Sequence, residues 1–302
     1  MTKRTTYAVL AAGIVSISFA AVFIRLADAP PPATAALRLL FASLLLAPAA
    51  LSSPRTRSEI LSLGREEIAL LGLSGLFLAL HFLSWIWSLS MTGVTSSIVF
   101  VTTSPIFIAV YSLAFGGERV SRGMWAGMAL AVAGGAIMGG GDLAKGGNSL
   151  SGDMLALAGA AAVAGYFIVG RRLRSGLSLL AYVFPVYTTA AVLLCAAAPL
   201  LGADLTGLPA SAYLYILLMA AVCQVSGHTI FNWALKRMKA SVVAMATLGE
   251  PAGTTLLAWL IINEIPGPAQ AIGGAVVLSG VYVVMRHNPT AVQSVPEGLD
   301  AP

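Results

Sequence analysis

The chain has 302 residues, of which 58% are hydrophobic and only 10% are charged, and its mean hydropathy is +0.89. Soluble domains carry about a quarter charged residues, and disordered chains carry more, so the composition excludes both classes. A net charge of +5 would suit nucleic-acid binding, but most basic residues lie between apolar stretches, as membrane topology requires. We therefore expect an integral membrane protein that binds the lipid bilayer and no nucleic acid.

Ten apolar runs approach or exceed the roughly 20 residues that a helix needs to cross a bilayer. They are residues 7–27, 33–51, 66–90, 94–115, 122–140, 151–171, 178–200, 210–234, 240–262 and 267–286. Lys3 and Arg4 precede the first run, as in a signal peptide, but the run is too long for one and is expected to be retained. The predicted fold is an all-α membrane protein with ten transmembrane helices.

Basic residues favour one orientation of this bundle. If the N-terminus lies in the cytoplasm, the cytoplasmic segments hold 14 of the 17 basic residues. These are Lys3, Arg4, Arg55, Arg57, Arg65, Arg119, Arg122, Arg171, Arg172, Arg174, Lys236, Arg237, Lys239 and Arg286. Because cytoplasmic loops are enriched in Lys and Arg, we expect both termini in the cytoplasm of a bacterial-type cell and the chain in its inner membrane.

The two halves of the sequence are similar when the chain is shifted by 146 residues. The shift aligns Trp87 with Trp233, Leu89 with Leu235, Pro105 with Pro251, Glu118 with Glu264, Gly127 with Gly273, Ala129 with Ala275, and Gly134 with Gly280. It superposes the first five runs on the last five, and because five is odd, the second copy must enter the membrane from the opposite side. We predict two inverted repeats, residues 1–145 and 146–290, followed by a disordered tail at 291–302. Such repeats are typical of transporters, because similar halves can expose a central site to each side in turn.

Each half also has a proline in its fourth run and a glutamate at the end of that run. The segments are Ser104-Pro105 through Gly117-Glu118, and Gly249-Glu250-Pro251 through Asn263-Glu264. With these features the chain resembles the EamA domains of the drug/metabolite transporter superfamily over nearly its whole length. His81, followed by aromatic residues, makes it most similar to the aromatic amino-acid exporters of that superfamily. The resemblance implies a ten-helix bundle around a central cavity.

Polar residues inside the runs are the candidate solute contacts. His81 and Trp85 lie one turn apart in run 66–90, and Gln224, His228 and Asn232 follow at the same spacing in run 210–234. Polar side chains that face lipid are costly, so both stripes should face the bundle interior. The candidate substrate-binding residues are His81, Trp85, Ser97, Phe100, Tyr166, His228 and Asn232. Hydrogen bonding between helices is the alternative role, above all for Gln224 and Asn232.

Four further residues have possible roles in transport. Glu250 lies near the centre of run 240–262, where it either titrates or contacts a substrate amine, or is a structural glutamate. Pro105 and Pro251 predict kinks in mid-helix, which in a carrier are expected to act as flexing points in gating. Arg38 lies six residues into run 33–51 and is expected to extend to the membrane surface, with binding of a substrate carboxylate as the alternative.

Other classes of protein find no support. The chain has no His-Glu-x-x-His, Gly-x-Ser-x-Gly or Walker A pattern, and its two cysteines lie in apolar runs without metal-ligand spacing. We expect no catalysis, metal ion or cofactor. The predicted function is a monomeric carrier that exports aromatic and other apolar amino acids by alternating access. A broad-specificity drug or metabolite efflux carrier is the alternative.

Overall fold

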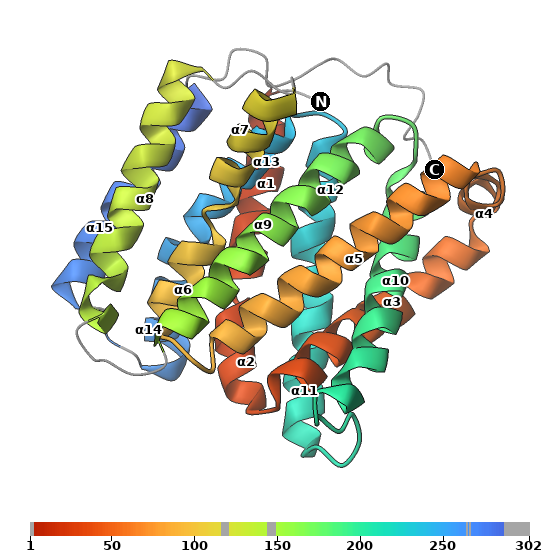
Figure 1. Ribbon diagram of the computed structural model, residues 1–302, viewed down its shortest axis with the longest axis horizontal. Helices are drawn as coiled ribbons and strands as arrows, with labels where there is room; N and C mark the ends of the chain where they lie inside the picture. The colour runs from red at the N-terminus through yellow and green to blue at the C-terminus, as the bar shows by residue number, and fades with distance from the viewer. Residues whose placement is uncertain (1–2, 116–120, 144–148, 264, 266, 287–302) are drawn as a thin grey trace.

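The computed structural model describes residues 3–115, 121–143, 149–263, 265 and 267–286, and every regular element within these residues is a helix (Figure 1). The α-helices are α1 (Lys3–Ser18), α2 (Ala20–Ala27), α3 (Pro31–Ser52), α4 (Pro54–Leu61), α5 (Arg65–Ser88), α6 (Val94–Val101), α7 (Ser104–Phe115), α8 (Arg122–Leu143), α9 (Ser149–Arg174), α10 (Leu179–Leu200), α11 (Ala210–Leu218), α12 (Thr229–Leu235), α13 (Ala240–Ala246), α14 (Glu250–Ile262) and α15 (Pro268–Arg286). A π-helical segment (Met219–His228) joins α11 to α12, and one turn of 3₁₀ helix (Thr247–Gly249) joins α13 to α14. The predicted tail at 291–302 lies outside the described residues.

Seven helical segments of the described chain are long and apolar enough to cross a membrane. They are Thr5–Ala27, Pro31–Ser52, Arg65–Ser88, Leu150–Arg174, Leu179–Leu200, Ala210–Leu235 and Ala240–Ile262. Ser97–Ser112 and Ala271–Val283 are shorter apolar helices. The fold therefore indicates a multi-pass membrane protein. All ten predicted runs contain helix, but the count of ten spans stays a prediction.

The helices pack mainly in antiparallel or crossing pairs. Helix α8 lies along α15 at one edge of the bundle, α3 packs against α10 at the other, and α5 packs against α9 between them (Figure 1). Glycines bring α8 and α15 together: a Cβ on Gly134 would lie 2.7 Å from the carbonyl oxygen of Gly273, and one on Gly280 would lie 2.6 Å from that of Gly127. In lipid no hydrophobic driving force brings apolar helices together, so they associate through close packing of this kind.

Two of the predicted spans are interrupted midway beside a proline. The run 94–115 ends as helix at Val101 and restarts at Ser104, and the run 240–262 passes through the 3₁₀ turn before α14 begins at Glu250. Pro105 and Pro251 each lie in the first turn of the second half-helix, where a missing N–H is tolerated. The structure thus has a helix break at each position where the proline predicts a kink. The role of these breaks in gating stays a prediction.

The run 210–234 also departs from a regular α-helix. Its central ten residues form the π-helical segment, in which the Thr229 hydroxyl reaches back five residues to the carbonyl oxygen of Gln224 at 3.3 Å. A π turn has more residues than an α turn, so the side chains that follow the segment point in other directions than in a continuous α-helix. Gln224, His228 and Asn232 are all buried in the bundle, as their stripe predicts. Their polar contacts differ, since Gln224 bonds to Arg38 and Asn232 bonds to Tyr166 and Tyr187.

Candidate functional site

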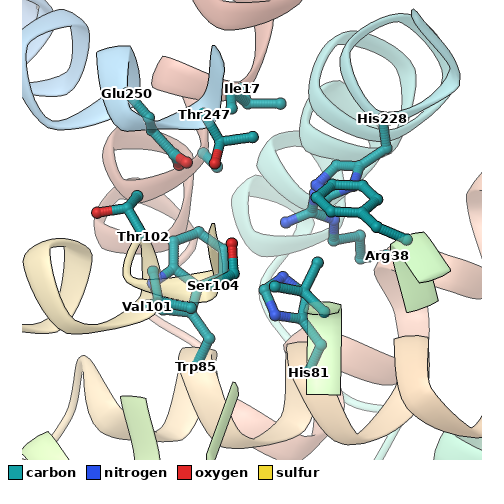
Figure 2. A pocket seen from close by; sticks show the side chains of 13 residues that line it. Ile17, Arg38, His81, Trp85, Val101, Thr102, Ser104, His228, Thr247 and Glu250 are labelled. Carbon is teal, nitrogen blue, oxygen red and sulfur yellow. The ribbon is translucent and has the colours of Figure 1, made fainter. Parts of the chain in front are cut away.

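A small cavity lies in the interior of the bundle, where residues from both halves of the chain meet (Figure 2). Its lining consists of Ile17, Ala20, Arg38, His81, Trp85, Val101, Thr102, Ser104, Val163, Phe167, His228, Thr247 and Glu250. The two helix breaks contribute directly: α7 begins at Ser104 and α14 begins at Glu250, and these two residues occupy equivalent positions under the 146-residue shift. The breaks thus place polar groups in the interior of an otherwise apolar bundle.

One wall of the cavity is made of aromatic and imidazole rings. The His81 ring lies nearly parallel to that of Trp85, with ring centroids 6.2 Å apart. The ring centroid of His228 is also 6.2 Å from that of His81. Nδ1 of His81 is 3.0 Å from the carbonyl oxygen of Gly159 on α9. Since a carbonyl only accepts, Nδ1 donates, and in a neutral ring Nε2 remains as an acceptor. This wall suits an apolar or aromatic group and offers it few hydrogen bonds.

Arg38 enters the cavity from α3 and is fully buried, with 0% of its surface exposed. Its Nε donates to Oε1 of Gln224 at 3.1 Å, and its guanidinium carbon lies 3.9 Å from the ring centroid of Phe82. The expectation that Arg38 extends to the membrane surface is therefore wrong. Helix α3 packs against both α10 and the π-helical segment, so position 38 faces protein. Snorkelling requires a side chain that faces lipid.

Glu250 and Arg38 lie on opposite sides of the cavity (Figure 2). Glu250 is half-buried and is the first residue of α14, where the helix dipole favours a negative charge. Figure 2 also shows Ser104 and Thr102 on the side of the cavity away from Arg38. The cavity therefore combines one basic and one acidic side chain with an aromatic wall.

The cavity is small in this conformation. The space open to the centres of water molecules is about 30 Å³, enough for two or three waters. A second hollow of about 240 Å³ lies between α2, the start of α3 and the end of α5. Ala20 and Trp85 line the cavity while their chain neighbours Ala21 and Ile86 line this hollow, so α2 and α5 border both spaces. A solute of amino-acid size enters the cavity only if helices move.

The structure divides the candidate site residues into two groups. His81, Trp85, His228 and Glu250 line the cavity, and Pro105 and Pro251 each follow a lining residue. The remaining candidates, which are not among the lining residues, are Ser97, Phe100, Tyr166 and Asn232.

Three of these four candidates make hydrogen bonds within the bundle. The hydroxyl of Ser97 pairs with that of Ser88, and Nδ2 of Asn232 donates to the hydroxyls of Tyr166 at 2.6 Å and Tyr187 at 3.2 Å. These hydroxyls and the Asn232 amide nitrogen thus already have partners on neighbouring helices or on the adjacent segment, while Oδ1 of Asn232 is buried without one.

The lining residues Thr102 and Thr247 were not among the candidates. The sequence does indicate Ser104, because the 146-residue shift that aligns the two prolines also aligns Ser104 with Glu250. Within the described residues, no group of three His, Cys, Asp or Glu side chains is placed to hold a metal ion.

A membrane-spanning helical bundle with interrupted helices around a central polar site is the architecture of a secondary transporter. Comparison with known proteins agrees: the EamA-like transporter family matches the chain twice, over residues 4–140 and 150–286. These matches cover most of the chain, which belongs to the EamA-like transporter family and is a multi-pass membrane protein.

Two individual relatives of the chain are also named as transporters. The chain is 27% identical over 216 residues to the uncharacterized transporter YdfC of Bacillus subtilis (strain 168), covering 71% of this chain and 69% of that protein. It is 28% identical over 229 residues to an uncharacterized transporter of Archaeoglobus fulgidus, covering 72% and 75%. A crystal structure with 18% identity superposes with a TM-score of 0.77 over 94% of this chain and 98% of that one, and shows the fold alone. The family and these two relatives indicate a transporter and not an enzyme.

Proposed function

We propose that the chain exports amino acids, aromatic and other apolar ones, across the inner membrane by alternating access. The observation that carries the proposal is the cavity in which the rings of His81 and Trp85 face the carboxyl of Glu250. An amino acid with an apolar side chain presents the matching groups, since the rings accommodate the side chain and the carboxylate attracts the ammonium group.

The proposal includes ten transmembrane helices arranged as two inverted repeats, residues 1–145 and 146–290. The family matches support this arrangement, because 150–286 is 4–140 displaced by the same 146 residues that align the two halves. The packing of α8 on α15 supports it as well. Gly134 meets Gly273 while Gly280 meets Gly127, so each contact is the image of the other under that displacement.

Alternating access requires parts of the bundle to flex, and the helix breaks are the proposed flexing points. Pro105 prevents α6 from continuing into α7, and Pro251 does the same at the start of α14. Both breaks lie beside the cavity, so a change of angle there would alter access to it. The cytoplasmic location of both termini, which rests on the basic residues, and a monomeric state complete the proposal.

Uptake into proteoliposomes tests the substrate class. Purified protein is reconstituted, and uptake of labelled phenylalanine, methionine, threonine and a drug-like organic cation is measured with and without a pH gradient. We expect phenylalanine and methionine to enter faster than threonine and faster than into empty vesicles. Amino-acid uptake equal to that of empty vesicles would refute the proposal. Uptake of the cation alone would favour broad drug or metabolite efflux, which the same aromatic wall and carboxylate also suit.

Single substitutions test the cavity as the site of transport. His81→Ala and Trp85→Ala should each reduce phenylalanine flux roughly tenfold or more, because each removes a large part of the ring wall. Trp259→Ala is the matched control, since Trp259 lies on α14 with 46% of its surface exposed on the outside of the bundle. Unchanged flux in both cavity variants, with correctly folded protein, would place the site elsewhere.

A further inference from the structure

The guanidinium of Arg38 has unused hydrogen-bonding capacity at the centre of the protein. Arginine carries five N–H donors, and here the Nε donor is bonded to Gln224 while Nη1 and Nη2 are buried without any partner. The contact with the Phe82 ring covers one face of the guanidinium but satisfies none of these donors. A buried charge with unpaired donors is unfavourable unless a partner is supplied, so the side chain is arranged for a group that arrives from outside.

The charge of Arg38 is also not matched by a direct acidic neighbour. Glu250 is the acidic residue of the cavity lining, but neither Nη1 nor Nη2 makes a hydrogen bond to it. Gln224, Phe82, His81 and His228 lie close to Arg38 and carry no negative charge, while Glu250 is the acidic residue that faces it across the cavity. Figure 2 shows the guanidinium end of Arg38 directed into the cavity.

We propose that Nη1 and Nη2 of Arg38 bind the carboxylate of the transported solute. The planar fork of arginine matches the two oxygens of a carboxylate, and such bidentate pairs are among the strong hydrogen-bonded interactions in proteins. The inference rests on the proposed function for the identity of that solute as an amino acid. Its ammonium group then lies toward Glu250, on the opposite side of the cavity.

The pairing of one basic and one acidic side chain predicts which solutes the site prefers. A zwitterion brings one negative and one positive group, and so gives both Arg38 and Glu250 a partner. A carboxylate without an amine leaves Glu250 unpaired, and an amine without a carboxylate leaves Arg38 unpaired. Sites with unpaired buried polar groups reject such analogues strongly. The site should therefore prefer the zwitterion to either singly charged analogue.

Equilibrium dialysis of the purified full-length chain tests this directly. The probes are labelled phenylalanine, phenylpropionate, which lacks the amine, and phenethylamine, which lacks the carboxylate. We expect Arg38→Met to weaken phenylalanine and phenylpropionate binding roughly tenfold to a hundredfold, the range for hydrogen bonds to a charged group, and to leave phenethylamine binding unchanged or tighter. Arg38→Lys keeps the positive charge without the planar guanidinium, and it should weaken binding of the two carboxylates less than Arg38→Met does. Arg57→Gln, an exposed arginine on α4, is the control for loss of one positive charge.

The possible results separate the inference from the proposed function. Equal weakening of all three probes by Arg38→Met in folded protein would mean a structural role and overturn the inference. Phenylalanine binding that is unaffected by Arg38→Met would overturn it as well, while the amino-acid carrier could still be correct. Arg38-dependent binding of phenylpropionate in a protein that transports no amino acid would support the carboxylate site and refute the proposed function. If Arg38→Met does not fold, comparison of Arg38→Lys with the unmodified chain decides, since the loss of affinity must again be confined to carboxylates.

Discussion

Gly280 on α15 lies against Gly127 on α8 so closely that a Cβ at position 280 would be 2.6 Å from the Gly127 carbonyl oxygen. The reciprocal pair, Gly134 and Gly273, is equally tight at 2.7 Å. As residue numbers rise along α8, the contacted residues fall along α15, so the helices are antiparallel. This antiparallel contact is the one expected if α8 and α15 are the equivalent helices of the proposed inverted repeats.

This packing should make Gly134 intolerant of any side chain. Gly134→Ala places a methyl group against backbone atoms that have no room to move, and we expect it to lower the free energy of unfolding by about 1–3 kcal/mol. Gly274→Ala is the matched control, because the nearest atom to its Cβ would be 3.9 Å away. The control should be neutral or stabilising by up to about 1 kcal/mol, since alanine is the better helix former. Thermal denaturation in detergent measures both, and equal effects would contradict the prediction.

Replacement of the prolines at the helix breaks should slow transport more than it weakens binding. Pro105→Ala restores an N–H that can bond to the Val101 carbonyl and join α6 to α7. If flexing at the break is rate-limiting, we expect the maximal flux of Pro105→Ala and Pro251→Ala to fall several-fold, with KM within about a factor of two. Pro48→Ala, at an exposed position inside α3, is the control. A change in KM alone would argue against a role in gating.

Cysteine labelling should place the two ends of the bundle on opposite sides of the membrane. Leu61 at the end of α4 and Leu200 at the end of α10 are 86% and 87% exposed, and Figure 1 shows these segments at different ends of the molecule. In a chain with Cys195 and Cys223 replaced by serine, we expect an impermeant maleimide added to intact cells to label Leu200→Cys but not Leu61→Cys. Permeabilised cells, in which both should react, are the control. Labelling of both variants, or of neither, in intact cells would contradict the predicted orientation.

Stability should depend on pH through Glu59 of α4. Partial burial raises the pKa of Glu59, but hydrogen bonds from the backbone N–H of Ser178 and from Arg55 outweigh it and leave the pKa below its ordinary value. A carboxyl with a lowered pKa in the folded state stabilises the fold above its unfolded pKa, about 4.3, and this stabilisation is lost as the pH falls through the folded pKa. We expect Glu59→Gln to lower the free energy of unfolding by about 0.5–1 kcal/mol at pH 7, and to lower it progressively less as the pH falls below the unfolded pKa.

A pH series of thermal denaturation measures the Glu59 effect. Glu66→Gln is the control, because Glu66 pairs with Arg172 on the surface, with its side chain 73% exposed, and should matter less. The same destabilisation by Glu59→Gln at pH 3 and at pH 7 would contradict the assignment.

Tyr166 and Asn232 are expected to hold helices together. Tyr166→Phe removes the hydroxyl to which Asn232 donates at 2.6 Å, leaves a buried amide with one partner fewer, and should destabilise the protein by about 1–3 kcal/mol. Because neither residue lines the cavity, the affinity for phenylalanine should stay within about twofold, whereas His81→Ala should reduce it. A large loss of affinity in Tyr166→Phe without loss of stability would return Tyr166 to the site.

The sequence was sufficient for the helices and for the two positions where they break. Apolar runs report which segments can enter lipid, and proline acts locally, so Pro105 and Pro251 mark the interruptions without any knowledge of the fold. The position of Arg38 inside a membrane helix was also predicted, but the direction of its side chain, toward protein and not toward the membrane surface, was not. Hydropathy is averaged around a helix and does not tell which face meets protein, and that face decides whether an arginine snorkels or is buried.

Solute contacts were harder to identify for a related reason. A polar side chain in a membrane helix needs a partner, and a neighbouring helix can supply it as well as a solute can. Asn232 found its partners in Tyr166 and Tyr187, while His228, four residues earlier, faces the cavity. The π-helical segment that ends at His228 alters the helical register, and i+4 spacing alone gave no warning of it.

The unfilled donors of Arg38 have a practical consequence for handling the protein. An empty carrier must keep two buried nitrogens without partners, so any molecule that satisfies them lowers the free energy of the folded state relative to the unfolded one. Preparations made without additives should be the least durable. Compounds from a metabolite collection could then be ranked by how long each one preserves a monodisperse sample in warm detergent, and such a ranking would need neither vesicles nor radiolabel.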